Sequence, residues 1–170
     1  MLKSLPTWIF PKRLALARDN LKGHVALAQM ERLHDSLCDV QGDAHIDWSF
    51  AMDDKQRPTI SGSVHAQLPM LCQRCLQPML WPVDKRVALV ILTHEPTENE
   101  ELPAGYEANT LINTPNSLIT LIEDELILAL PIVAIHSICP SNEYQLQETL
   151  AEDLTFQNNP FYVLSKLKNN

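Results

Sequence analysis

Three consecutive segments in which apolar and polar residues alternate constrain the fold of this chain most strongly. They cover residues 44–52, 59–71 and 79–93, and only short turn-type sequences separate them. The first segment shows the pattern clearly, with an apolar side chain at every second position: Ala44, Ile46, Trp48 and Phe50. This spacing places the apolar side chains on one face of a β-strand. Successive strands joined by short turns pair with their neighbours, so the sequence predicts an antiparallel β-meander.

One helix is predicted with clear boundaries, at residues 118–129. Apolar residues recur there at helical spacing, Asn116 or Ser117 can cap the first turn, and Pro131 stops the helix. Weaker signals predict, in chain order, a basic arm over 1–20 with a short helix at 11–19, a strand at 21–27, helical spacing over 28–38, an acidic loop over 95–115 and a helix over 159–168. We therefore expect an α+β fold with one domain over residues 1–170. Its antiparallel meander or partly closed sheet is covered by one main helix, with short N- and C-terminal helices.

Length and composition exclude several classes of protein. At 170 residues, 45% hydrophobic and 20% charged, the chain is typical of a soluble globular domain. It contains no apolar run near the ~18 residues of a membrane span, and Pro6 and Pro11 break up any apolar core of a signal peptide. Four cysteines do not resemble a secreted disulfide scaffold. We expect a cytoplasmic protein with reduced thiols.

Charge is divided unevenly along the chain. Residues 1–86 hold eleven Lys and Arg against nine Asp and Glu, a balance of +2, whereas residues 87–170 hold two Lys against twelve acids, a balance of −10. Such polarity can orient a protein between a polyanion and a basic partner. Acid-rich loops that serve only solubility explain it equally well, so charge alone does not decide the function.

The most chemically suggestive motif is Cys72-x-x-Cys75, which falls at a tight turn between two predicted strands. Two thiols at this spacing form half of a zinc knuckle, and His136-x-x-Cys139 has the ligand types and spacing of the other half. A site with four protein ligands is structural, with no open position for catalysis.

Two other interpretations of the cysteines remain open. A reduced Cys72-x-x-Cys75 can simply cap a hairpin while Cys139 packs as a small hydrophobe. A redox pair needs a helix N-terminus to lower the thiol pKa, and the flanking segments are predicted strands. Cys38 falls on a helical apolar stripe and is expected in the core.

Nothing in the sequence indicates a catalytic site of a known type. The chain has no phosphate-binding or nucleophile-elbow glycine motif, and only four glycines. The six histidines show no HExxH spacing. We therefore expect a protein that is not an enzyme.

Basic residues supply candidate contacts to RNA phosphates. They lie in the N-terminal arm and near the cysteine turn: Lys12, Arg13, Arg18, Lys22, Arg74, Lys85 and Arg86. Within the predicted helix, Glu123, Asp124 and Glu125 fan over roughly 200° and cannot all converge on one metal ion. They are interpreted as a solvated polar face or as a surface for a basic partner.

Three sequence blocks, taken in order, resemble a known family. They are residues 71–75, residues 123–131 with His136 shortly after, and residues 159–168. This arrangement resembles the YceD family, the large ribosomal RNA subunit accumulation proteins of bacteria and plastids. The blocks span residues 71–168, and the first 70 residues match more loosely. Many relatives carry further cysteines after the Pro131 segment, where this chain keeps Cys139.

The resemblance implies a function and maps it onto residues of this chain. It implies a non-catalytic ribosome-biogenesis factor, needed for accumulation and processing of large-subunit (23S) rRNA and associated with that RNA or with a pre-ribosomal particle. The family's functional block falls on Cys72, Arg74 and Cys75, and its acidic helix falls on residues 123–125. The alternatives are a small zinc- or thiol-dependent enzyme centred on Cys72 and Cys75, and a protein-only adaptor for a basic ribosomal protein.

Overall fold

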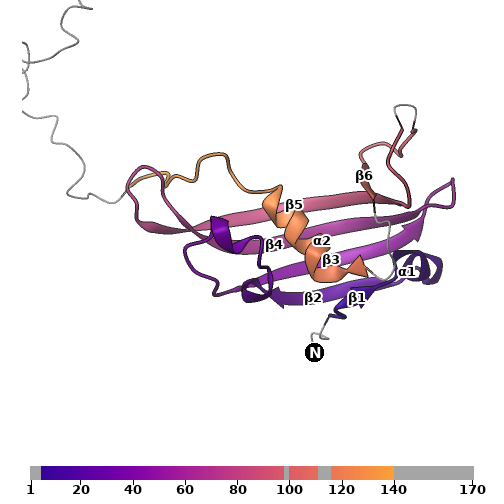
Figure 1. The fold of residues 1–170 in the computed structure, drawn as a ribbon, viewed down its shortest axis with the longest axis horizontal. Helices are drawn as coiled ribbons and strands as arrows, with labels where there is room; N and C mark the ends of the chain where they lie inside the picture. The colour runs from indigo at the N-terminus through magenta and orange to yellow at the C-terminus, as the bar shows by residue number, and fades with distance from the viewer. Residues whose placement is uncertain (1–4, 98–99, 111–115, 140–170) are drawn as a thin grey trace, which may run out of the picture. The chain divides into compact units, whose positions relative to one another are not determined.

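The predicted β-meander forms the centre of the structure (Figure 1). The computed structural model describes residues 5–97, 100–110 and 116–139, and within them five strands pair in the order β2-β3-β4-β5-β6. Their bounds are β2 Asn20–Ala26, β3 Asp43–Met52, β4 Pro58–Leu71, β5 Pro78–Leu92 and β6 Glu107–Thr110. The pairs β2–β3, β3–β4 and β4–β5 are antiparallel. The three strands predicted from alternation are confirmed to within one residue at each end.

The last strand of the sheet corrects two predictions. Strand β6 pairs in parallel with residues 89–92 of β5, inside the segment 95–115 that was expected to be a loop throughout. Its four residues, Glu-Ala-Asn-Thr, carry no apolar alternation, so they give no strand signal. Within the described residues β2 and β6 are the two edges and do not pair, so the sheet is open rather than partly closed.

Two ion pairs tie the described part of the acidic segment to the β3–β4 turn. Arg57 Nη1 lies 2.8 Å from Glu100 Oε1, and Lys55 Nζ lies 3.0 Å from Glu101 Oε2. The Arg57–Glu100 pair is largely shielded from water, whereas the Lys55–Glu101 pair is exposed and therefore weak. These acids therefore neutralise nearby cations.

The apolar face of the sheet and helix α2, Leu118–Ile127, share one core. The alternation predicted for β3 is observed: Ala44, Ile46, Trp48 and Phe50 are all buried. Helix α2 contributes four buried apolar side chains, Leu118, Leu121, Ile122 and Leu126. The predicted cap is confirmed, because Ser117 Oγ accepts a hydrogen bond from Thr120 N at 3.2 Å.

Shorter elements complete the part of the chain that the structure describes. Strand β1, Trp8–Ile9, pairs antiparallel with β7, Asn116–Ser117, and the short helix predicted in the basic arm is α1, Pro11–Ala17. No described helix is long and apolar enough to cross a membrane. Contact analysis divides the chain into Met1–Ser137 and Ile138–Asn170. Most of the second unit, including the predicted helix at 159–168, lies outside the described residues, so that helix and the single domain remain predictions.

The helix expected over residues 28–38 is absent. Two single-turn 3₁₀-helices occur instead, η1 Leu27–Gln29 and η2 His34–Ser36. Between them the backbone N–H groups of Arg32 and Leu33 donate to Glu123 Oε1, at 2.7 and 3.1 Å. Because these donors bond a side chain of α2, they do not form α-helical bonds. Cys38, at the end of this non-helical segment, is exposed, so the expectation that it lies in the core is wrong.

Two of the three α2 carboxylates are buried, so the expectation of a solvated polar face is wrong for them. Glu123 is 5% exposed and Glu125 3%. Glu123 Oε2 accepts from Arg32 Nε at 2.9 Å, and Glu125 Oε2 lies 2.8 Å from Lys85 Nζ on β5. Asp124, which is half-buried, also pairs with Arg32, at 2.8 Å. The Lys85 pair fixes α2 on β5, and the Arg32 pairs fix it on the segment between β2 and β3. Both anchors position the segment that follows α2.

We expect Glu123→Ala to lower the free energy of unfolding by about 3 kcal/mol. The substitution removes the Glu123 acceptor of the Arg32 backbone N–H and of the Leu33 N–H, which keeps its bond to Met30 O, and it removes the carboxylate partner of the Arg32 guanidinium. Asp124→Ala on the same helix is the matched control and should cost less than about 1 kcal/mol, because its pair is partly exposed. Urea denaturation measures both, and equal losses would contradict the anchoring role of Glu123.

Candidate metal centre

The turn between β4 and β5 holds Cys72 and Cys75 in a fixed, buried arrangement. Cys72 N donates to Gln77 O at 3.0 Å, and Leu76 N donates to Cys72 O at 2.8 Å. Leu76 adopts the left-handed conformation, with φ of 58°, which turns the chain back into β5. Cys72 is fully buried and Cys75 is 3% exposed. The structure thus confirms that the motif sits at a tight turn between strands.

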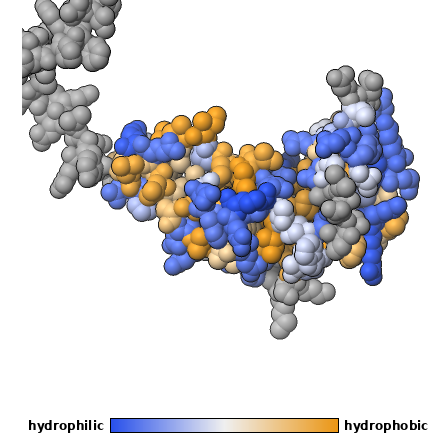
Figure 2. All heavy atoms as spheres, in the orientation of Figure 1, coloured by the Kyte–Doolittle hydropathy of each residue, from blue (hydrophilic) through white to orange (hydrophobic). Residues whose placement is uncertain are grey.

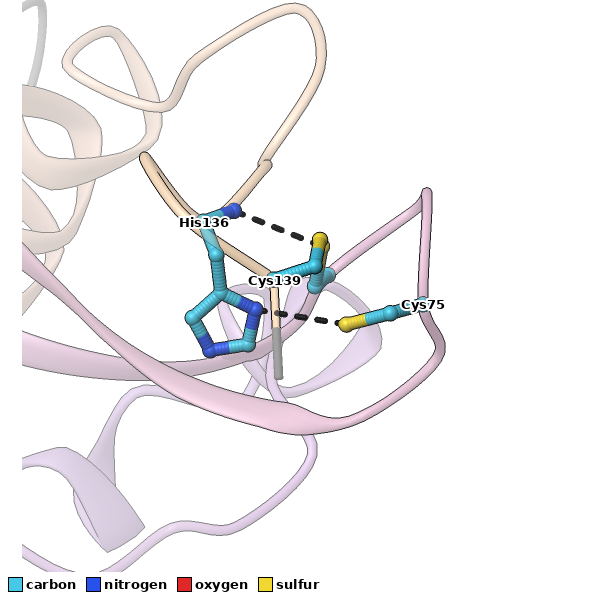
Figure 3. Close-up of side chains that lie close together, drawn as sticks. Cys75, His136 and Cys139 are labelled. Carbon is cyan, nitrogen blue, oxygen red and sulfur yellow. Dashed lines mark hydrogen bonds between the residues drawn. The ribbon is translucent and has the colours of Figure 1, made fainter. Parts of the chain in front are cut away.

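The segment after α2 returns to this turn and hydrogen-bonds to it. Gln73 N donates to Ala134 O at 2.8 Å, and Arg74 Nη2 donates to His136 O at 2.9 Å. His136 N in turn donates to Cys72 Sγ at 3.3 Å. Figure 3 shows the His136 ring facing Cys75, with Nδ1 3.4 Å from Sγ. Two segments separated by about sixty residues therefore meet at the motif.

Four residues with metal-ligating side chains gather here. Cys72, Cys75, His136 and Cys139 each offer one ligand atom, and these atoms lie within 4.8 Å of one another. Sulfur ligands of tetrahedral zinc lie about 3.7 Å apart, given Zn–S bonds of about 2.3 Å. A small contraction would therefore close the cluster around an ion. The structure brings together all four residues that the sequence grouped, and their chemistry is compatible with zinc.

The surroundings of Cys72 favour its thiolate form. Burial by itself raises the pKa of the Cys72 thiol, but backbone N–H groups of His136, Cys75 and Arg74 point at the sulfur and lower its pKa to about 5. A thiolate is the form that binds a metal ion. The backbone around the motif thus stabilises negative charge on this sulfur even without a bound cation.

The basic residues predicted to contact RNA do not share one face. Helix α1 and its C-terminal residue carry three of them, all exposed: Lys12, Arg13 and Arg18. Arg74 lies in the β4–β5 turn, at the opposite end of the sheet from α1 (Figure 1). Lys85 and Arg86 are adjacent on β5 and so point to opposite faces. Lys85 pairs with Glu125, and Lys22 pairs with Asp47.

Arg32 is a structural cation that the sequence did not single out. It lies in a segment expected to be helical, and its guanidinium bonds Glu123, Asp124 and the carbonyl of Thr120. The signal that could have found it is the position of Glu123. That residue follows Ile122 on the apolar side of α2, where a buried carboxylate needs a cation.

An open mixed sheet, one helix fixed by buried ion pairs and a Cys/Cys/His/Cys cluster define a small α+β protein with a candidate structural metal centre. The family model "Large ribosomal RNA subunit accumulation protein YceD" matches residues 60–168. The Large ribosomal RNA subunit accumulation protein YceD of Haemophilus influenzae is 35% identical over 172 residues, which cover 96% of each chain. The chain therefore belongs to the YceD family. No solved structure matches it.

We expect the cysteine cluster of the purified protein to hold one zinc ion, and Cys75→Ser to lose that ion. Cys75 is one of the four ligand-type residues, and serine is a poor zinc ligand. Cys38→Ser is the matched control, since Cys38 is exposed and outside the cluster. Inductively coupled plasma mass spectrometry gives the metal content. Full zinc occupancy in Cys75→Ser, or loss of zinc in Cys38→Ser, would rule out this centre.

Proposed function

We propose that this chain is a non-catalytic factor that promotes accumulation and processing of large-subunit (23S) rRNA by binding that RNA or a pre-ribosomal particle. One observation carries the proposal: a relative named for large ribosomal RNA subunit accumulation aligns with this chain over 96% of both lengths. We place this activity in the cytoplasm, where ribosomes assemble.

The RNA contacts proposed here begin at helix α1. Lys12, Arg13 and Arg18 are exposed, and none has a carboxylate within ion-pair distance among the described residues. Arg86 is also exposed and has no such partner there, whereas the exposed Arg74 donates to His136 O. Lys22 and Lys85 already neutralise carboxylates of this chain. The cations of α1 are therefore better placed to bind phosphates than Lys22 and Lys85.

The cysteine cluster supports a structural role better than catalysis. Four protein side chains would fill a tetrahedral coordination shell, and Cys72 is fully buried. A catalytic zinc keeps an open position for water or substrate. A metal ion bound there would hold the β4–β5 turn against the segment after α2 and so keep Arg74 in a defined position.

Removing two cations from α1 should weaken RNA binding and reduce its dependence on salt. For Lys12→Ala with Arg13→Ala, the magnitude of the slope of log affinity against log salt should fall by about 1.4 to 1.8, since each phosphate contact contributes about 0.7 to 0.9. Lys22→Ala with Lys55→Ala removes the same charge from cations that have carboxylate partners, and it should change the slope much less. Filter binding of a large-subunit rRNA fragment between 50 and 200 mM salt, roughly the range in which such contacts dominate, measures both. Equal slopes for the two double variants would exclude α1 as the contact.

Crosslinking in cells separates RNA binding from the adaptor alternative. We expect ultraviolet crosslinking to recover large-subunit rRNA with the chain, and deletion of its gene to lower mature large-subunit rRNA. Recovery of a basic ribosomal protein without RNA would favour the adaptor. An unchanged rRNA level after deletion would contradict the proposed function whichever partner is recovered.

A further inference from the structure

Three histidines lie directly opposite one another on the sheet face away from the core. His24 of β2 pairs in register with His45 of β3, and His45 pairs with His65 of β4. Asp84 of β5 continues the row beside His65. All four side chains are exposed, whereas the residues on either side of His24, His45 and His65 along their strands are buried. We call these four residues the histidine row.

The contacts of the row place the rings of His24 and His45 side by side and hold the ring of His65 at both nitrogens. The rings of His24 and His45 have centroids 5.8 Å apart. His65 Nδ1 lies 3.1 Å from Asp84 Oδ1, and His65 Nε2 lies 3.0 Å from Ser63 Oγ. A carboxylate on one ring nitrogen is the arrangement that fixes a metal-binding histidine and raises the basicity of its other nitrogen. In this structure the other nitrogen, Nε2, contacts the hydroxyl of Ser63.

Bringing the three rings onto one ion requires a change of rotamer. Adjacent strands are about 4.8 Å apart, so His24 and His65 lie about 10 Å apart with His45 between them. The surface is hollowed beside the row, and the hollow is lined by His45, His65, Asp43 and Asp84. Two carboxylates at its rim favour a cation. The exposed side chains can change rotamer at modest cost.

We propose that the histidine row binds a divalent transition-metal ion through His24, His45 and His65, with Asp84 positioning His65. Imidazole suits Zn²⁺, Ni²⁺ and Cu²⁺, and three protein ligands leave a position for water. On binding, the ion displaces the Ser63 hydroxyl from Nε2 of His65. This site is separate from the cysteine cluster, shares no residue with it and does not depend on the proposed function.

The remaining described histidines do not form a second such group. His34 Nε2 contacts the backbone oxygen of Leu27, His94 lies beside Glu100, and His136 belongs to the cysteine cluster. His94 is exposed like the row and stands apart from it, which makes it the matched control.

The test counts zinc bound by the full-length chain. Equilibrium dialysis against Zn²⁺ should give one equivalent more for the wild-type protein than for His45→Ala, and His94→Ala should match the wild type. Because the count is a difference between variants, it is valid whether or not the cysteine cluster holds zinc. A wild-type capacity no larger than that of His45→Ala would overturn the proposal.

Two further variants keep the test decisive. Asp84→Asn should weaken the affinity of this equivalent by about 10- to 100-fold, as loss of an outer-shell carboxylate does. His24→Gln, on an edge strand, replaces His45→Ala if that central variant fails to fold, as judged by thermal melting, and should weaken the same equivalent at least about tenfold. With Cu²⁺ as the probe, the electron paramagnetic resonance spectrum of the wild type should show imidazole nitrogen coupling that His24→Gln reduces. Unchanged affinity in both variants would show adventitious surface binding only.

Discussion

The contact between the β4–β5 turn and the segment after α2 is the constraint on which the candidate site depends. Gln73 N bonds Ala134 O, and His136 N bonds the sulfur of Cys72. Each bond crosses about sixty residues of sequence, so the loop-closure entropy must be offset where the chain returns. A metal ion held by both segments would supply that stabilisation, because binding free energy at a site formed only in the folded state is folding free energy.

Helix α2 leads the chain back to the β4–β5 turn, and its buried carboxylates hold the helix in the position that allows this contact. Glu123 and Glu125 are buried and bond Arg32 and Lys85 across the core boundary. Removing one partner of such a pair costs more than the pair itself contributes. The acid-rich second half of the chain therefore includes carboxylates that fix the fold. The uneven charge along the sequence therefore overstates the number of surface carboxylates available to a basic partner. The exposed cations of α1 are the clearest charged feature of the described surface.

The sequence predicted the parts of the structure that follow from local pattern. Alternation identified β3, β4 and β5, and the Ser117 cap located the start of α2. The spacing of the cysteines and His136 also predicted the cluster, because ligand types constrain their partners. Contacts distant in sequence were not predictable in this way. Glu123 diverts residues 32 and 33 from a helix, and β6 pairs through its backbone alone. The histidine row depends on strand register, which no single segment reveals.

A metal ion bound by Cys72, Cys75, His136 and Cys139 would join the two segments. X-ray absorption spectroscopy at the zinc edge of the His45→Ala protein tests this directly, because that variant lacks the central histidine of the row. The account predicts a first shell of three sulfur atoms at about 2.3 Å and one imidazole nitrogen at about 2.0 Å. A shell of nitrogen and oxygen atoms alone, or a protein that takes up no zinc, would contradict it.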